Sequence, residues 1–420
     1  MGRKPTPPVR LRRRKGQYAQ RQSGLDDRED HVRSALDKAV SIEDLRRIAR
    51  QRLPCALFQF VDDGSEGEVT LRENRRAFDC VGFQARNATW TPVRDLSTTV
   101  LGSELAFPVM IAPTGATRFV HPDGELAMTK AACKAGTVYV YPHGAGHAME
   151  AVDAVATRPM WYQLYHYGGR DVVEAALERI RRCTFSVLVL TVDSAGHPRL
   201  ENSLRNGLTE LATGGLGNLI SELPQLLARP GWVLGNLRDG FRSEMPNIVR
   251  PDGSIITHMD IYAGRQPPAP AFTWDDIGWL RERFGGPIVL KGIVSAEDTR
   301  RALDHGVAGV VVSNHGGRML DGAPATLRAL PEVVKAADGK LEVLLDSGVR
   351  RGSDVIKALA LGAKAVLIGR AALYGLASGG EAGVSRALAM LRSDMDRAMT
   401  FMGCTSVKEL DASWVRLPND

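Results

Sequence analysis

Eight short apolar runs, separated by stretches with helical periodicity, constrain the fold of this chain more than any other feature. The runs are rich in Val, Ile and Leu, and they are apolar throughout instead of alternating with polar residues. Continuous runs of this kind are typical of parallel strands that are covered on both faces. They lie at 107–113, 137–142, 160–165, 187–193, 287–292, 309–314, 342–348 and 365–370.

Amphipathic helical patterns fill most of the gaps between these runs. In residues 170–183, for example, apolar side chains recur at helical spacing, and Ser295 is a suitable N-cap for a helix over 295–305. Further helices are expected over 326–337, 351–361 and 381–403. Strands that are each followed by a helix predict a closed α/β structure, the (β/α)8 or TIM barrel. A doubly wound open sheet is the alternative, which the absence of a G-x-G-x-x-G motif disfavours.

Two segments do not follow this alternation of strands and helices. An N-terminal helical segment is expected after Ser41, with Pro54 ending or restarting it. Residues 200–272 contain no clear strand and predict a long insertion after the fourth strand, of the kind that often forms a lid. Its apolar part, 216–236, has three open interpretations: a lid over the site, a packed insertion or a contact with a membrane surface.

The chain carries a net charge of +6, and its first residues account for that excess. Residues 1–21 contain eight basic residues and no acid, so subtracting them leaves −2 for the rest. We therefore expect a basic, solvated leader over 1–35 and a single folded domain over 36–420, with no specific nucleic-acid partner. The five cysteines are scattered and form no CxxC pair, which predicts neither a metal site nor disulfides. A cytoplasmic protein is expected, with a peripheral position at the inner face of the membrane as the alternative.

Polar side chains end six of the eight apolar runs. Active sites in (β/α)8 barrels lie at the carboxyl ends of the strands, so these groups are expected to meet at one rim. Buried charged groups need partners, which predicts one connected network. The residues are Gln163, Tyr165, Thr191, Asp193, Lys291, Asn314, His315, Asp346, Gly369 and Arg370.

The last two runs lead into glycine-containing turns before helices, at 346–352 and 369–370. Backbone N–H groups at such turns bind phosphate, and in these barrels the common phosphate site follows the seventh and eighth strands. Position alone leaves open whether the phosphate belongs to a cofactor or to a substrate.

The segment Ser313-Asn314-His315-Gly316-Gly317-Arg318 resembles the FMN-dependent 2-hydroxy-acid dehydrogenase and oxidase family, which includes glycolate oxidase, quinone-linked lactate dehydrogenase and mandelate dehydrogenase. The resemblance runs from about residue 41 to the end of the chain. Further matching segments are 70–74, 111–115, 163–165, 191–193, 290–292 and 348–352.

This resemblance implies oxidation of a 2-hydroxy acid to the 2-oxo acid, with two electrons passing to FMN. His315 is implied as the catalytic base and Asp193 as the carboxylate that stabilises its charged form. Arg318 would grip the substrate carboxylate through two hydrogen bonds, and Tyr165 would bind the substrate hydroxyl. Lys291 would favour the reduced flavin.

The same resemblance implies a set of cofactor-binding residues, a homo-oligomer that is commonly a tetramer, and reoxidation by oxygen, a quinone or another carrier. The cofactor-binding residues are Pro113, Thr114, Gly115, Gln163, Thr191, Lys291, Ser313, Asp346, Gly348, Arg350, Gly369 and Arg370. Gly115 stands where oxygen-using relatives often have Ala, which favours a dehydrogenase.

Three departures from the family pattern concern the substrate. Phe60 stands where many relatives have a carboxylate-binding tyrosine, and residues 194–201 retain one of two commonly paired arginines. His143 and His147 replace a Ser-rich strand end, either as part of an unusual substrate pocket or as ordinary loop residues. A larger or modified substrate is therefore expected. The alternative function is oxidation of a peptide-derived or amine substrate in a biosynthetic pathway, which Arg318 disfavours because those relatives lack it.

Overall fold

The computed structural model describes residues 35–90, 92–208, 210, 216–250, 252–262 and 272–417. Only the last residue of the predicted leader falls within this part, as the start of α1 (Ala35–Lys38). The next helix, α2 (Ile42–Arg52), begins at the predicted cap, where Ser41 Oγ accepts a hydrogen bond from Asp44 N at 3.2 Å. Pro54 then starts α3 (Cys55–Asp62), and α4 is Val69–Asp79.

The predicted barrel is confirmed. One eight-stranded sheet runs in the order β4-β13-β12-β11-β10-β7-β6-β5, with every pair parallel. The outer strands meet through Ile111, whose N–H donates to Val138 O at 2.9 Å, so the sheet closes. The strands are β4 (Val109–Ile111), β5 (Val140–Pro142), β6 (Met160–Leu164), β7 (Phe185–Thr191), β10 (Ile288–Ile293), β11 (Gly309–Val312), β12 (Glu342–Leu345) and β13 (Ala365–Ile368).

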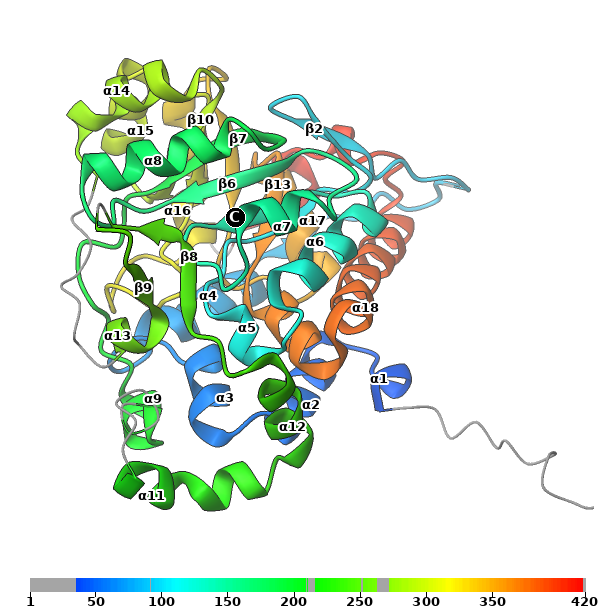
Figure 1. The fold of residues 1–420 in the computed structure, drawn as a ribbon. Helices are drawn as coiled ribbons and strands as arrows, with labels where there is room; N and C mark the ends of the chain where they lie inside the picture. The colour runs from blue at the N-terminus through cyan, green and yellow to red at the C-terminus, as the bar shows by residue number, and fades with distance from the viewer. Residues whose placement is uncertain are drawn as a thin grey trace, which may run out of the picture.

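Helices follow these strands and surround the barrel (Figure 1). They are α5 (Thr117–Val120), α6 (Gly124–Ala135), α7 (Met149–Asp153), α8 (Arg170–Ile180), α14 (Trp274–Phe284), α15 (Ala296–Asp304), α16 (Thr326–Ala337), α17 (Gly352–Ala360) and α18 (Arg370–Met402). The helix expected over 381–403 is the second part of α18, which starts at Arg370 and is kinked at Gly379 and Gly380.

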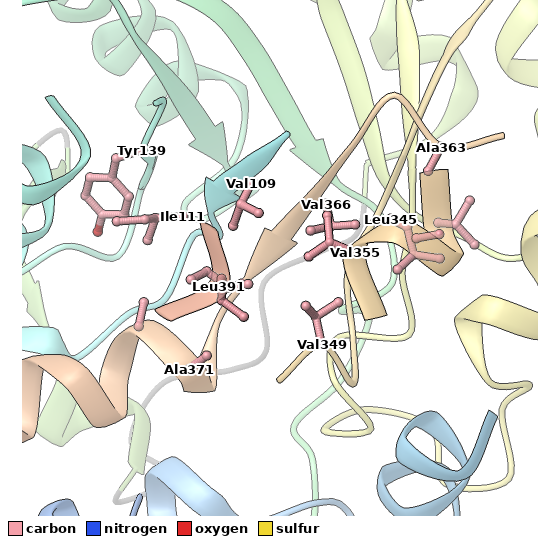
Figure 2. Close-up of a cluster of buried hydrophobic side chains, with 14 of the residues drawn as sticks. Val109, Ile111, Tyr139, Leu345, Val349, Val355, Ala363, Val366, Ala371 and Leu391 are labelled. Atoms are coloured by element: carbon pink, nitrogen blue, oxygen red, sulfur yellow. The ribbon is translucent and has the colours of Figure 1, made fainter. Parts of the chain in front are cut away.

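Successive residues of each strand point to different layers of the core. Met110 faces the barrel interior, whereas Val109 and Ile111 belong to the larger layer between the strands and the helices. Figure 2 shows part of that outer layer, where Val109, Ile111 and Val366 lie near Leu391 and Ala371 of α18. Burial on both faces explains why the strands read as continuous apolar runs.

A hairpin closes the end of the barrel at which the strands begin. It consists of β2 (Thr98–Val100) and β3 (Ser103–Leu105), and Val100 and Leu105 pack into the interior layer. Trp161 Nε1 of β6 donates to Ser103 Oγ at 3.0 Å. A second small sheet pairs β1 (Gly82–Phe83) with β14 (Val415–Arg416), beyond the 3-10 turns Val407–Glu409 and Ala412–Trp414. The open end of the barrel is therefore the one at the carboxyl ends of the strands.

The interval after β7 departs from prediction. Residues 200–272 contain a strand pair, β8 (Glu244–Val249) and β9 (Ile255–Thr257), where no strand was expected. Pro246 lies within β8 and the register of the pair is irregular, which hides the alternating pattern of an antiparallel strand. The helices of this insertion are α9 (Glu201–Arg205), α11 (Leu216–Leu227), α12 (Pro230–Asp239) and α13 (His258–Tyr262). In Figure 1, α9 and α11 lie at the same end of the molecule as α3.

Candidate active site

His315 and Asp193 form the central pair at the open end of the barrel. His315 Nδ1 lies 2.9 Å from Asp193 Oδ1, and His315 Nε2 lies 3.5 Å from the Tyr165 hydroxyl. Burial raises the pKa of Asp193, but the charges of His315 and Lys291 outweigh it and hold that pKa below its usual value. A carboxylate that stays charged fixes the imidazole tautomer, with the proton on Nδ1 and Nε2 directed away from Asp193.

The turn after β11 holds His315 in a left-handed backbone conformation. His315, Gly316 and Gly317 have φ values of 58°, 70° and 72°. A Cβ at Gly317 would lie 2.7 Å from Leu71 N, and a Cβ at Gly316 would lie 2.7 Å from Arg370 Nη1. The two glycines are therefore required for the close approach of this turn to α4 and to Arg370.

Lys291 is a buried cation between two strand ends. Its Nζ donates to Ser313 Oγ at 2.9 Å and lies 3.3 Å from Asp346 Oδ2. Burial lowers the pKa of Lys291, but Asp346 and Asp193 outweigh it and raise the pKa above its ordinary value. Lys291 therefore keeps its positive charge within the barrel mouth.

Arg318 and Arg370 both bind backbone oxygens at the C-terminal end of α3. Arg318 Nη1 donates to Phe60 O at 2.7 Å and to Asp63 O at 3.1 Å, and its guanidinium lies 4.9 Å from the centre of the Phe60 ring. Arg370 donates to Gly316 O at 2.8 Å and to Asp63 O at 2.5 Å. Burial and the nearby charges of Arg318 and Arg350 lower the pKa of Arg370 to about 10. Clustered cations of this kind are typical of a site for an anion.

Most of the predicted residues line one cavity of about 450 Å³. Three predicted residues do not line it and instead bind residues that do: Asp193, Thr191 and Ser313. Asp193 binds His315 and Ser313 binds Lys291, as described above. Thr191 Oγ1 accepts from Gln163 Nε2 at 2.9 Å. The predicted residues that line the cavity are Pro113, Thr114, Gly115, Gln163, Tyr165, Lys291, His315, Arg318, Asp346, Gly348, Arg350, Gly369 and Arg370.

His143 and His147 do not line the cavity. His143 is buried with Nδ1 3.2 Å from Tyr165 O, and His147 Nδ1 lies 2.8 Å from the buried Glu125 carboxylate. These contacts support the interpretation of both as loop residues that hold neighbouring segments.

Several lining residues were missed from the sequence. Tyr167, Met245 and Ile261 reach the cavity, the last two from the insertion. Leu200 also lines it, and the loss of one arginine from residues 194–201 was the only sequence signal for this part of the wall. The others gave no signal, because only tertiary packing brings the loop after β6, β8 and α13 together at the barrel mouth.

The residues present fit a flavin mononucleotide. Three buried polar atoms at the site have no hydrogen-bond partner within the described residues: Thr114 Oγ1, Asp193 Oδ2 and Arg370 Nε. Gly369 lines the cavity, and a Cβ there would lie 3.6 Å from Thr114 Cγ2, in ordinary contact with the segment after β4. Arg350 and Arg370 supply charge for a phosphate, and Gln163 and Lys291 supply donors for a polar ring.

Fold and site together define a class of flavin-binding barrel enzymes, and comparison with known proteins gives the family. Residues 49–417 match the FMN-dependent dehydrogenase family. Glycolate oxidase 1 of Zea mays is 37% identical over 385 residues, 92% of this chain and 98% of the relative. Pre-mycofactocin synthase of Mycobacterium tuberculosis is 38% identical over 387 residues, 88% of this chain and 92% of the relative.

A solved structure of the monotopic membrane protein (S)-mandelate dehydrogenase superposes with a TM-score of 0.83 and 34% identity, covering 90% of this chain and 99% of that one. The chain therefore belongs to the FMN-dependent dehydrogenase family. It is an oxidoreductase whose cofactor is FMN, as predicted.

Proposed function

We propose that this enzyme oxidises a 2-hydroxy acid to the corresponding 2-oxo acid. The observation that carries the proposal is the placement of His315 and Arg318 in the lining of one cavity, with Asp193 bound to the imidazole. A base and a carboxylate-binding cation that share a cavity can hold a 2-hydroxy acid with its reacting carbon near the base.

His315 acts on the substrate through Nε2. It takes one proton there, and the Asp193 carboxylate at Nδ1 stabilises the imidazolium that forms. The Tyr165 hydroxyl, 3.5 Å from Nε2, binds the substrate oxygen beside that proton. FMN, when bound, would accept the two electrons together with the second hydrogen that leaves the substrate.

Arg318 binds the substrate carboxylate. Its Nη1 contacts with Phe60 O and Asp63 O hold the guanidinium in place before the substrate binds, which lowers the entropic cost of binding. Phe60 offers a ring and no hydroxyl at this place, so Arg318 carries more of the carboxylate binding than it does in relatives with a tyrosine.

The cofactor is held by the strand ends and the last two turns. Pro113, Thr114 and Gly115 would pass beside the flavin, and Gln163, Thr191 and Ser313 would order its polar edge together with Lys291. Asp346 and Gly348 would contact the ribityl chain, and Arg350, Gly369 and Arg370 would bind the phosphate. The Lys291 charge stabilises an electron-rich cofactor.

Anaerobic mixing of the holoenzyme with a panel of 2-hydroxy acids tests the function. Loss of the flavin absorbance with at least one acid, and formation of the 2-oxo acid in equal amount, is the expected result. A fully FMN-loaded enzyme that no member of the panel reduces would contradict the proposal. If only a peptide-derived or amine substrate reduces the flavin, the alternative function, oxidation of such a substrate, is established.

We further infer that residues 36–420 form one FMN-binding unit in a homo-oligomer, and that the 200–272 insertion places it at a membrane surface. Leu227 of α11 and Leu234 and Leu237 of α12 are exposed to 70%, 53% and 56%, and the exposed Arg238 lies beside them. Within the described residues no helix is long and apolar enough to cross a membrane.

Sedimentation with vesicles of phosphatidylglycerol tests this peripheral position. The protein is expected to bind these vesicles and not vesicles of phosphatidylcholine. The double substitution Leu234→Ser with Leu237→Ser is expected to weaken the binding. Binding that both substitutions leave unchanged would contradict the inference. Sedimentation velocity of the same protein without vesicles gives the oligomeric state, for which a tetramer is expected.

A further inference from the structure

The cavity lining contains two unlike groups of residues. One group is charged or strongly polar and belongs to the barrel strands and turns described above. The insertion after β7 contributes His258 to the lining, and together with the loop after β6 it also supplies the other group, which is apolar or aromatic. Its members are Tyr167, Leu200, Leu204, Leu208, Met245 and Ile261. We call this second group the apolar wall.

The hairpin part of the apolar wall is firmly packed. Met245 clusters with the buried residues Val172, Ile248 and Ile256, and Tyr167 and Ile261 pack against this cluster. Asn247 fastens the hairpin to the barrel, because its side chain accepts from Met149 N at 3.0 Å and donates to the Tyr141 hydroxyl at 2.6 Å. This part of the wall therefore has a fixed shape and is not a loosely attached loop.

The α9 part of the wall is tied to the segment that binds Arg318. Asp63 Oδ2 accepts hydrogen bonds from Ser203 N at 2.7 Å and from Ser203 Oγ at 2.9 Å. The backbone oxygen of the same Asp63 accepts from Arg318 Nη1 at 3.1 Å. Leu200 and Leu204, on either side of Ser203, are thereby held near the carboxylate-binding cation.

The wall also reaches the catalytic imidazole. The Tyr167 ring centre lies 5.3 Å from that of Tyr165, whose hydroxyl is 3.5 Å from His315 Nε2. On the cofactor side, a Cβ at Gly144 would lie 3.4 Å from Met245 Sδ, and a Cβ at Gly115 would lie 3.3 Å from Gly144 O. The apolar wall therefore extends from beside the base to Met245, next to Gly144, and the buried His258 follows it towards Gly115.

We infer that the substrate is a 2-hydroxy acid with a bulky apolar group on its α-carbon, such as a branched, long-chain or aryl group. This inference rests on the proposed function and names its substrate class. With the carboxylate on Arg318 and the hydroxyl at His315, the substituent on the α-carbon is the part left to contact the apolar wall. A small acid leaves that wall in contact with water, whereas an apolar substituent removes both surfaces from water.

The test is kcat/KM of the holoenzyme for lactate, 2-hydroxybutyrate and 2-hydroxyhexanoate with an artificial electron acceptor. Burial of each added methylene raises kcat/KM by about four-fold, so 2-hydroxyhexanoate, with three more than lactate, exceeds it by about 60-fold. In Met245→Gln, which keeps the length of the side chain, the ratio between these two acids falls by about ten-fold. The control Val40→Asn, at a residue 79% exposed before α2, keeps the wild-type ratio.

The outcomes separate the inference from the function beneath it. If lactate is used as well as or better than 2-hydroxyhexanoate, the substrate class is wrong while hydroxy-acid oxidation stands. The same holds if Met245→Gln binds FMN, unfolds at the wild-type temperature and keeps the wild-type ratio. If no 2-hydroxy acid reduces the flavin, the proposed function itself is wrong.

Discussion

His315 Nδ1 and Asp193 Oδ1 lie 2.9 Å apart, although 122 residues separate them along the chain. β7 and β11 are not neighbours, because β10 lies between them, so the pair spans two strand intervals of the barrel mouth. The contact depends on parallel strands whose carboxyl ends meet at one mouth, and it links the fold directly to the proton transfer proposed for His315.

Asp193→Asn tests the role of that contact. The amide removes the charge that stabilises the imidazolium, so kcat is expected to fall by about 100- to 10⁴-fold while FMN remains bound. Steady-state turnover and the flavin spectrum measure the two effects. Asp338→Asn changes a carboxylate 70% exposed and serves as the control. A wild-type kcat for Asp193→Asn would remove this carboxylate from the mechanism.

Arg318→Lys tests carboxylate binding. Lysine keeps the charge but cannot make two parallel hydrogen bonds, so kcat/KM is expected to fall by about ten- to 100-fold, mainly through KM. Arg328→Lys is a matched control, because Arg328 is 54% exposed on α16. If kcat/KM of Arg318→Lys equals that of the wild type, Arg318 does not bind the substrate carboxylate.

Lys291→Met tests the buried ion pair. The substitution leaves the Asp346 carboxylate, 3.3 Å from Nζ in the wild type, without its cation, and the free energy of unfolding is expected to fall by about 3–5 kcal/mol. Adding Asp346→Asn removes the uncompensated charge and restores part of the loss. Urea unfolding with and without added FMN separates loss of fold from loss of cofactor. A double variant no more stable than the single one would contradict this account.

His143 predicts a dependence of stability on pH. Burial lowers the pKa of its imidazole from 6.5 to about 4. Between these values the unfolded chain binds a proton that the folded chain does not, so stability falls as the pH falls, by up to about 1.4 kcal/mol per pH unit. Urea unfolding from pH 7 to pH 4.5 should show a flatter profile for His143→Gln than for the wild type or for His305→Gln. Parallel profiles for all three would show that His143 is not buried in its neutral form.

The sequence was most informative where local pattern and topology agree. The eight apolar runs predicted the strands because each strand is buried on both faces. The polar residues near the strand ends meet because the carboxyl ends of parallel strands lie at the same end of the barrel. Asp193, Asn314 and Asp346 lie just beyond their strands and not within them, since the strands end before the mouth.

The insertion was less predictable. Pro246 interrupts the alternation of β8. Met245 and Ile261 reach the cavity only because the hairpin docks on the barrel through Asn247 and through packing against Tyr167. The site roles, the leader and the domain boundaries stay predictions.

Stopped-flow reduction of the flavin in His315→Ala, under anaerobic conditions and with the most reactive acid of the panel, tests the central claim most directly. The variant is expected to keep FMN and to reduce it about 1,000-fold more slowly than the wild type, because alanine supplies no base in place of the imidazole that Asp193 orients. Flavin that bleaches in His315→Ala at close to the wild-type rate would contradict the assignment of His315 as the base.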